Sequence, residues 1–260
     1  MTGRWSARAV SAPEGRDALR LRYEIEGAAT RRYDAAQFWD RRYHRRRFEH
    51  VDALLRALVR RDDTFLDVGC GTGEYLALAT GLGAHAVGID LSEAYCGRVT
   101  SSGLVAVVGD GTGLPMADAS CDVVLCSEVI EHVPAVLARR CIDEITRVAR
   151  RAVVVTTPNA LAVVRRVARR IIPSRVTDLD LEVGHINLLG PSELTSSLER
   201  PGWQLTQFAV RHVIPPLVGD VRPALPSALA PMVSRIERGS DRWCPSAGNM
   251  MFAVLEPTPG

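Results

Sequence analysis

The stretch FLDVGCGTGEYL, residues 65–76, decides the fold of this 260-residue chain. An apolar run carries the acidic residue Asp67 at its end, and three glycines follow at alternate positions, Gly69, Gly71 and Gly73. Glycine lets the backbone bend sharply and leaves room for a ligand to lie against it. The stretch therefore predicts a β-strand, a ligand-binding turn and the start of a helix.

The glycine spacing excludes two common nucleotide sites. A dinucleotide fingerprint needs G-x-G-x-x-G, but Glu74 and Leu76 occupy the two positions where the last glycine could stand. A phosphate-binding P-loop needs a lysine, and the chain contains none, so all 32 basic residues are arginine. A carboxylate at the strand end, Asp67, also suits a cationic ligand group better than a pyrophosphate. A dehydrogenase is therefore disfavoured.

Outward from this turn, residues 64–158 alternate short β-branched runs with amphipathic stretches, which is typical of a parallel sheet with helices on both faces. Strands are expected at 64–68, 84–90, 104–109, 121–127, 152–157, 203–213 and 249–255, and helices at 74–81, 92–101, 134–150 and 191–200. The predicted fold class is α/β, a doubly wound, Rossmann-like seven-stranded sheet.

The length suits one domain with additions. Residues 1–60 are expected to form an N-terminal helical cap, because apolar residues keep a helical period between 48 and 61. Residues 61–260 are expected to form the ligand-binding domain, with a lid insertion near 159–190 and a proline-rich insertion near 214–246.

The composition argues against several further classes of protein. The chain is 47% hydrophobic and 24% charged, with a formal net charge of +2, which argues against general nucleic-acid binding. No run approaches the roughly 18 apolar residues of a membrane span, and no signal peptide is recognised. Six cysteines without a C-x-x-C pair indicate buried, reduced thiols. We expect a cytoplasmic protein.

Two further acids end the next two strands. Asp90 follows AVGI at residues 86–89, and Asp110 follows VVG at residues 107–109. In doubly wound folds, an acid at the position of Asp90 forms hydrogen bonds with ribose hydroxyls. The second could accept a hydrogen bond from an adenine amino group. Three acids at successive strand ends after such a turn predict a nucleoside pocket.

Four motifs in this order carry a resemblance to a known family: DVGCGTG at 67–73, VGIDLS at 87–92, VVGDGTGLP at 107–115 and DVVLCSEVIEHV at 122–133. Together they resemble the class I S-adenosylmethionine-dependent methyltransferases. The resemblance implies that S-adenosylmethionine is the cofactor and that a terminal antiparallel hairpin completes the sheet. It also implies the cofactor-binding residues, which are Asp67, Gly69, Gly71, Gly73, Asp90, Leu91, Asp110, Gly111 and Ser127.

The segment SEVIEHV, residues 127–133, contains a second group of candidate site residues. If it is helical, Glu128, Glu131 and His132 share one face, and His185 follows much later. This pairing is similar to the ubiquinone-pathway O-methyltransferases and the small-RNA 2′-O-methyltransferases. In the RNA branch the four side chains bind Mg²⁺, so the resemblance implies a candidate metal site at Glu128, Glu131, His132 and His185.

Other interpretations of these residues stay open. His132 or His185 could act as a general base, with Glu128 as a further catalytic residue, or the whole set could be structural.

The roles of two arginine-rich segments stay open as well. Residues 160–172 could form a surface helix, a lid over the acceptor, or an interfacial helix on anionic lipid. Residues 41–47 could bind a phosphorylated partner, or they could be solvated on a packed helix.

The sequence thus predicts methyl transfer from S-adenosylmethionine to a small-molecule acceptor, at oxygen, by in-line displacement, in secondary metabolism or quinone-like chemistry. The alternatives are an RNA or tRNA methyltransferase and a non-catalytic adenosyl-binding domain. The acceptor, the pathway and the oligomeric state are not encoded in any motif found.

Overall fold

The computed structural model describes residues 38–162, 184–211 and 248–259, together with the single positions 166, 170 and 235, and side chains from residue 45 onward. The expected cap before residue 38, most of the lid insertion and nearly all of the proline-rich insertion lie outside the described residues.

The described chain forms one seven-stranded sheet in the order β3-β2-β1-β4-β5-β7-β6. Its strands are β1 (Thr64–Val68), β2 (His85–Asp90), β3 (Ala106–Val108), β4 (Cys121–Ser127), β5 (Ala149–Pro158), β6 (Trp203–Arg211) and β7 (Met250–Pro257). The first five strands run parallel, and β7 is antiparallel to both of its neighbours, β5 and β6. The predicted fold class and the terminal antiparallel hairpin are confirmed.

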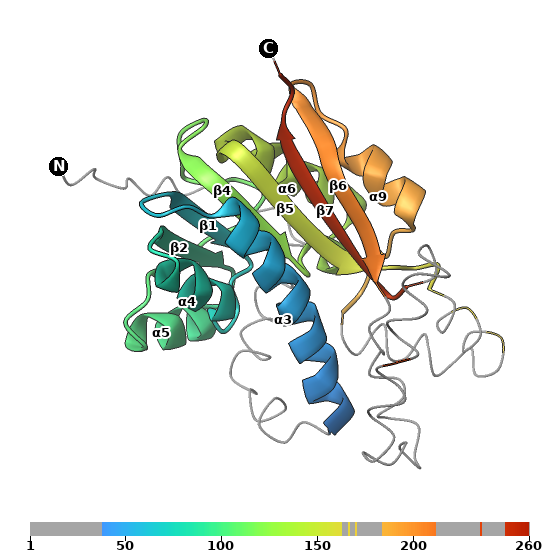
Figure 1. The fold of residues 1–260 in the computed structure, drawn as a ribbon, viewed down its shortest axis with the longest axis horizontal. Coiled ribbons are helices and arrows are strands. Elements are labelled where there is room, and N and C mark those ends of the chain that lie inside the picture. Colours follow the sequence, from blue (N-terminus) through green and yellow to red (C-terminus); the bar gives the residue numbers. More distant parts are fainter. Residues whose placement is uncertain are drawn as a thin grey trace.

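Helices cover both faces of the sheet (Figure 1). Their bounds are α3 (Phe38–Leu58), α4 (Glu74–Gly81), α5 (Glu93–Ser101), the short 3₁₀ turn η1 (Ile130–His132), α6 (Ala135–Val148) and α9 (Pro191–Leu198). In Figure 1, α3 crosses in front of the sheet and α6 lies behind β5. The side chain of Ser92 caps α5 by accepting a hydrogen bond from the Tyr95 N–H.

The core has two layers because side chains alternate along each strand. In β5, Val153 and Val155 join the cluster that includes α6, whereas Ala152 and Val154 join the cluster that includes α3. A strand buried on both faces explains why residues 152–155 are continuously apolar. Such a rigid sheet holds the ends of its strands in fixed positions, and the site lies at those ends.

The helix α3 begins earlier than its apolar period indicates, at Phe38 instead of residue 48, and it ends at Leu58. Val51 and Leu55 are fully buried against the sheet and α4. The first turns of α3 are rich in arginine, at residues 41–47, so hydropathy alone hides the start of the helix. This helix is therefore the described part of the predicted cap, and it packs as an integral part of the domain.

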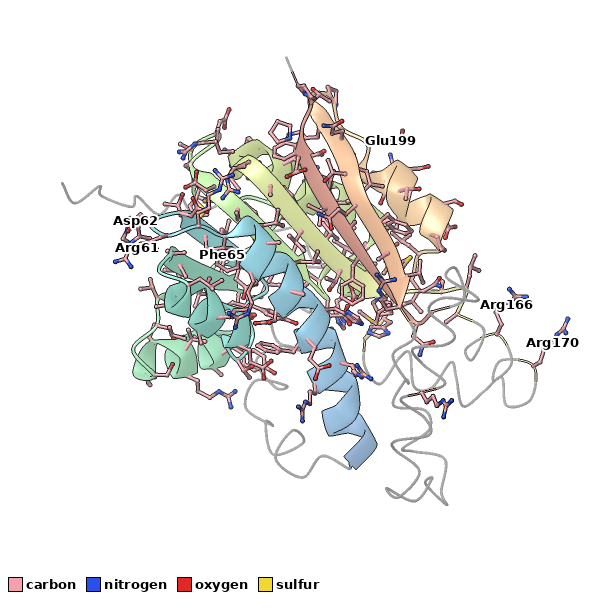
Figure 2. The ribbon with its side chains drawn as sticks, in the orientation of Figure 1. Arg61, Asp62, Phe65, Arg166, Arg170 and Glu199 are labelled. Atoms are coloured by element: carbon pink, nitrogen blue, oxygen red, sulfur yellow. The ribbon has the colours of Figure 1, made fainter. Side chains whose placement is uncertain are left out.

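None of the helices that the structure describes is long and apolar enough to cross a membrane. In the predicted lid segment, Arg166 and Arg170 are both exposed, and Figure 2 shows their side chains directed away from the sheet. Solvated arginines at these two positions agree with an amphipathic segment. The lipid-binding interpretation of residues 160–172 stays a prediction.

Candidate functional site

The turn after β1 is a left-handed glycine loop. Gly69, Gly71 and Gly73 have φ values of 75°, 49° and 81°, a region that other residues adopt only at a cost. The N–H of Gly69 donates to the carbonyl of Ile89 at 2.7 Å, which ties the loop to the end of β2. A Cβ on Gly69 would lie 2.3 Å from Val129 Cγ2, so the loop passes tightly over the segment after β4.

Asp67 lies under this loop and is fully buried. Neither of its carboxylate oxygens has a hydrogen-bond partner among the residues that the structure describes. Burial, with a smaller contribution from the nearby Asp90 carboxylate, raises the pKa of Asp67 to about 8. A buried carboxylate of this kind is stabilised by a cationic group, which is what the sequence predicts for its ligand.

Asp90, at the end of β2, holds two turns at once. One carboxylate oxygen accepts a hydrogen bond from the Gly71 N–H at 2.9 Å, and the other accepts from the Ser92 N–H at 2.8 Å. Asp90 therefore holds the glycine loop and the start of α5 in place, and Leu91 lies between these two anchored turns. The contact of Asp90 with a ribose stays a prediction.

Asp110 follows the end of β3, so the three acids stand at the carboxyl ends of three neighbouring parallel strands. The Thr112 N–H donates to its carboxylate at 2.8 Å. A Cβ on Gly111 would lie 2.8 Å from Val68 Cγ1, so the backbone must approach β1 closely here. This edge is where ligands bind in open α/β sheets.

An arginine clamp from α6 holds the loop that carries Asp110. The guanidinium of Arg147 donates to the carbonyls of Met116 and Leu114 at 2.8 and 3.1 Å, and it pairs with Glu144 at 2.7 Å. Glu144 in turn accepts from the Leu114 N–H at 2.7 Å. These contacts were not foreseen from the sequence, since single charges on an amphipathic helix give no sign of a distant partner.

The hypothesis that Glu128, Glu131 and His132 share one helical face is wrong. The chain after β4 makes only the 3₁₀ turn η1, and Glu128 has a left-handed φ of 59°. Glu128 therefore turns to the other side, where its Oε2 lies 3.4 Å from Arg47 Nη1. Its Oε1 is 3.4 Å from the hydroxyl of Thr156, which also pairs with Ser127 Oγ at 2.8 Å.

Arg47 is a site residue that sequence reasoning missed. One of the two interpretations of residues 41–47 has their arginines solvated on a packed helix, yet only 18% of the Arg47 side chain is exposed. A signal existed: Arg47 precedes the buried Val51 and Leu55 by four and eight residues, so it shares their helical face. Its neighbour Phe48 stacks on Tyr75 of α4, with ring centroids 5.6 Å apart, so α3 also contacts the helix that follows the glycine loop.

Glu131, His132 and His185 do come together. Each offers a ligand atom within 4.8 Å of the other two, and the two imidazole centroids are 5.0 Å apart. Glu131 is fully buried, and burial raises its pKa well above the usual range. Thr157 donates its hydroxyl hydrogen to Glu131 Oε2 at 3.0 Å. Three of the four predicted metal-site residues thus converge, and Glu128 is not among them.

Comparison with known proteins agrees with the motifs. Residues 66–156 match the family model described as a methyltransferase domain. An uncharacterized methyltransferase of Mycobacterium sp. (strain KMS) is 45% identical over 73 residues, which are 27% of this chain and 29% of that protein. The ubiquinone biosynthesis O-methyltransferase of Paraburkholderia phytofirmans is 40% identical over 78 residues, 27% of this chain and 34% of that protein. The matched stretch thus spans about a third of these relatives.

Solved structures extend the likeness to the whole fold. An S-adenosylmethionine-dependent methyltransferase from Archaeoglobus fulgidus aligns with a TM-score of 0.56 at 19% identity, covering 81% of this chain and 94% of that chain. Magnesium protoporphyrin IX methyltransferase from Synechocystis, solved with bound S-adenosylmethionine, aligns at 0.61 and 16% identity, covering 96% and 100%. The resemblance to class I methyltransferases is thereby confirmed, in sequence over residues 66–156 and in fold beyond them.

Proposed function

We propose that the chain transfers a methyl group from S-adenosylmethionine to an oxygen atom of a small-molecule acceptor. The observation that carries the proposal is the row of three carboxylates at the ends of β1, β2 and β3, with Asp67 buried beneath a left-handed glycine loop. S-adenosylmethionine supplies an electrophilic methyl group on a positively charged sulfur, and a buried carboxylate favours such a cation.

The residues present fit the donor. The loop at Gly69, Gly71 and Gly73, with Asp67, would hold the methionine part. A Cβ on Gly71 would meet nothing within 4 Å, so the loop backbone there is open to a ligand. Asp90 and Leu91 would hold the ribose, Asp110 and Gly111 would hold the adenine, and Ser127 would line the far wall. The close approach of Gly111 to Val68 leaves no space for a side chain.

Oxygen is favoured by the two histidines that lie together beside η1. A hydroxyl acceptor must lose its proton as the new bond forms, so it benefits from a base, whereas a neutral amine does not need one before attack. His132 and His185, whose ring centroids are 5.0 Å apart, would take that proton. The chain must also position the acceptor oxygen in line with the methyl group. Such positioning can lower the activation barrier by ~7–11 kcal/mol.

Isothermal titration of the purified chain with S-adenosylmethionine and S-adenosylhomocysteine tests the donor half. Asp90→Asn should weaken both by at least about tenfold, because the amide cannot accept both backbone hydrogen bonds. Asp62→Asn is the matched control, since that side chain is 77% exposed, and it should bind like the original. Absence of binding by the folded, unsubstituted chain overturns the proposal.

Mass spectrometry on matched acceptor pairs tests the oxygen assignment. Phenols and alcohols should be converted to methyl ethers, whereas amines built on the same skeletons should not be methylated. Methylation of the amines alone would contradict the assignment to oxygen. Donor binding with no methylated product from any acceptor class would favour the alternative of a non-catalytic adenosyl-binding domain.

A further inference from the structure

A buried tyrosine hydroxyl lies next to the glycine loop and has no role in the assignments made so far. Tyr75 is the second residue of α4, two positions after Gly73, and only 7% of it is exposed. Its hydroxyl oxygen is buried and makes no hydrogen bond with any described residue. A buried hydroxyl without a partner costs free energy. This hydroxyl is therefore suited to a partner that the described residues do not supply.

The ring of Tyr75 is held in place by α3. Phe48 stacks on it, with ring centroids 5.6 Å apart and an angle of 8° between the ring planes. Both rings pack in the apolar cluster that contains Val51 and Leu55 of the same helix. The hydroxyl oxygen lies on the axis about which the ring turns, so a ring flip does not move it. Packing of the ring therefore fixes the position of the hydroxyl.

The Tyr75 hydroxyl lies among the polar groups of the site. Burial raises the pKa of Tyr75 to about 12. The nearby guanidinium of Arg47 and hydroxyl of Ser127 act in the opposite direction, and the nearby carboxylates of Asp67 and Glu128 raise the pKa further. The hydroxyl is thus close to groups carried by β1, β4 and α3. It keeps its hydrogen at neutral pH and can donate a hydrogen bond.

Asp67 and Tyr75 lie on the same side of the sheet. Phe65, two residues before Asp67 in β1, belongs to the apolar cluster that contains Tyr75. Side chains two residues apart in a strand point to the same face, so Asp67 points to that face as well. Both carboxylate oxygens of Asp67 are buried and lack partners among the described residues. This face thus presents a buried hydrogen-bond acceptor and a buried donor that do not bond to each other.

The amino-acid end of S-adenosylmethionine carries the complementary pair of groups. Its ammonium group can only donate hydrogen bonds, and its carboxylate can only accept them. The buried carboxylate of Asp67 suits the ammonium group and repels the ligand carboxylate, which therefore needs a neutral or positive donor beside it. The hydroxyl of Tyr75 is such a donor, and a hydrogen bond from a hydroxyl to a carboxylate is among the stronger kinds.

We propose that the Tyr75 hydroxyl binds the donor by donating a hydrogen bond to the carboxylate of its methionine part. The inference rests on the proposed function, because it assigns a further residue to the same donor pocket. Neither the glycine motif nor the acids at the strand ends mark a tyrosine as a ligand. The contact makes the pocket selective for nucleosides with an intact amino-acid end, since a nucleoside without that end gains nothing from Tyr75.

The stability of Tyr75→Phe distinguishes a ligand-binding hydroxyl from a structural one. The change removes one oxygen and keeps the ring that stacks on Phe48. Loss of a hydroxyl that bonds within the chain destabilises a protein, whereas loss of a buried hydroxyl without a partner does not. We expect the urea midpoint of the ligand-free variant to equal or exceed that of the original. A lower midpoint would overturn the proposal, because the hydroxyl would then have its partner within the chain.

Isothermal titration with three adenosine derivatives tests the contact itself. Tyr75→Phe should weaken binding of S-adenosylhomocysteine about 10–100-fold, as expected for the loss of a hydrogen bond to a charged group. Binding of 5′-methylthioadenosine, which lacks the whole amino-acid end, should change less than about twofold, because no hydrogen bond is lost. Decarboxylated S-adenosylmethionine keeps the ammonium group and lacks the carboxylate, so its affinity should be equally insensitive to the change.

Tyr95→Phe is the matched control. It removes the same atom from a tyrosine of α5 whose ring lies beside Arg98, with the guanidinium carbon 5.1 Å from the ring centroid. This variant should bind all three compounds as the original does. The proposal is overturned if Tyr75→Phe binds S-adenosylhomocysteine normally, or if it weakens decarboxylated S-adenosylmethionine to the same extent as S-adenosylhomocysteine.

The same titrations keep the two proposals apart. If the folded, unsubstituted chain binds neither S-adenosylmethionine nor S-adenosylhomocysteine, the proposed function is rejected and this inference with it. If the chain binds both and Tyr75→Phe binds them equally well, only the role of Tyr75 is rejected and the donor pocket stands.

Discussion

The guanidinium of Arg47 on α3 lies 3.4 Å from the carboxylate of Glu128, just beyond β4, and the two side chains are only 18% and 14% exposed. One helix thereby contacts both sides of the candidate site, since the adjacent Phe48 stacks on Tyr75 of α4. The pair also fixes the direction of Glu128, and with it the composition of the neighbouring Glu131–His132–His185 cluster.

Arg47→Met should lower the free energy of unfolding by about 2–4 kcal/mol, because Glu128 would remain largely buried without its counter-ion. Urea denaturation measures this change. Adding Glu128→Gln to Arg47→Met should restore part of the loss. The matched control is Arg45→Met, whose side chain is 81% exposed in a pair with Glu49 and whose loss should cost under about 0.5 kcal/mol. Equal losses for both arginines would contradict the assignment.

Asp67→Asn should stabilise the ligand-free protein increasingly as the pH rises from about 4 to 8. The folded-state pKa of Asp67 is raised to about 8, so between its unfolded value and pH 8 the folded chain holds a proton that the unfolded chain has lost. Stability from this group therefore falls as pH rises across that window and is level above it. The difference in unfolding free energy between variant and original should reach at least about 1 kcal/mol at pH 8.

Denaturation at a series of pH values checks the Asp67 prediction, with the donor left out of every sample. Asp143→Asn, at a side chain that is 60% exposed, serves as the control and should give a flat difference across the same range. A flat difference for Asp67→Asn as well would show that its pKa is not raised.

Gly69→Ala should destabilise the fold by at least about 2 kcal/mol. The new Cβ would stand 2.3 Å from Val129 Cγ2 at a φ of 75°, so steric overlap adds to left-handed strain. Gly71→Ala has the same kind of backbone but open space around the new atom, so it should cost only about 1 kcal/mol. Urea denaturation distinguishes the two, and the reverse order would refute the loop geometry.

Arg147→Met should release the loop between β3 and β4. Hydrogen exchange of the Leu114 amide should accelerate, and S-adenosylhomocysteine should bind about 3–10-fold more weakly, because Asp110 begins the same loop. Arg140→Met is the control, since Arg140 is an exposed arginine of the same helix, α6. An unchanged exchange rate at Leu114 would mean that the clamp is not needed to hold the loop.

Much of the architecture could be predicted from the sequence, because each parallel strand combines an apolar run with a turn signal. The strands Thr64–Val68 and Cys121–Ser127 and the helix Glu74–Gly81 have the predicted bounds. The third strand is shorter than predicted, Ala106–Val108, because only these residues pair with β2. The hydrophobic pattern of a sequence reflects the burial of its side chains. It does not indicate where the backbone of an edge strand stops pairing with its neighbour.

The site was less predictable, because it depends on backbone geometry over very few residues. Glu128 was placed on a helical face since SEVIEHV is compatible with a helix, but a single left-handed residue redirects it. The approach of His185 to His132 depends on three hydrogen bonds to η1, which leave no mark on hydropathy. Arg47 lies four residues before the buried Val51, so the two residues share one helical face. The burial of Arg47 is therefore predictable from the sequence, although its charge favours an exposed position.

The stretch between Asn159 and Gly184 has both of its ends pinned. Asn159 bridges to Leu189, the Ala160 N–H donates to the Leu189 carbonyl at 2.9 Å, and Ile186 and Asn187 are bonded to Glu131. Because these contacts are made by β5, η1 and the segment 184–189, the positions of Asn159 and His185 are set by described residues on either side of that stretch.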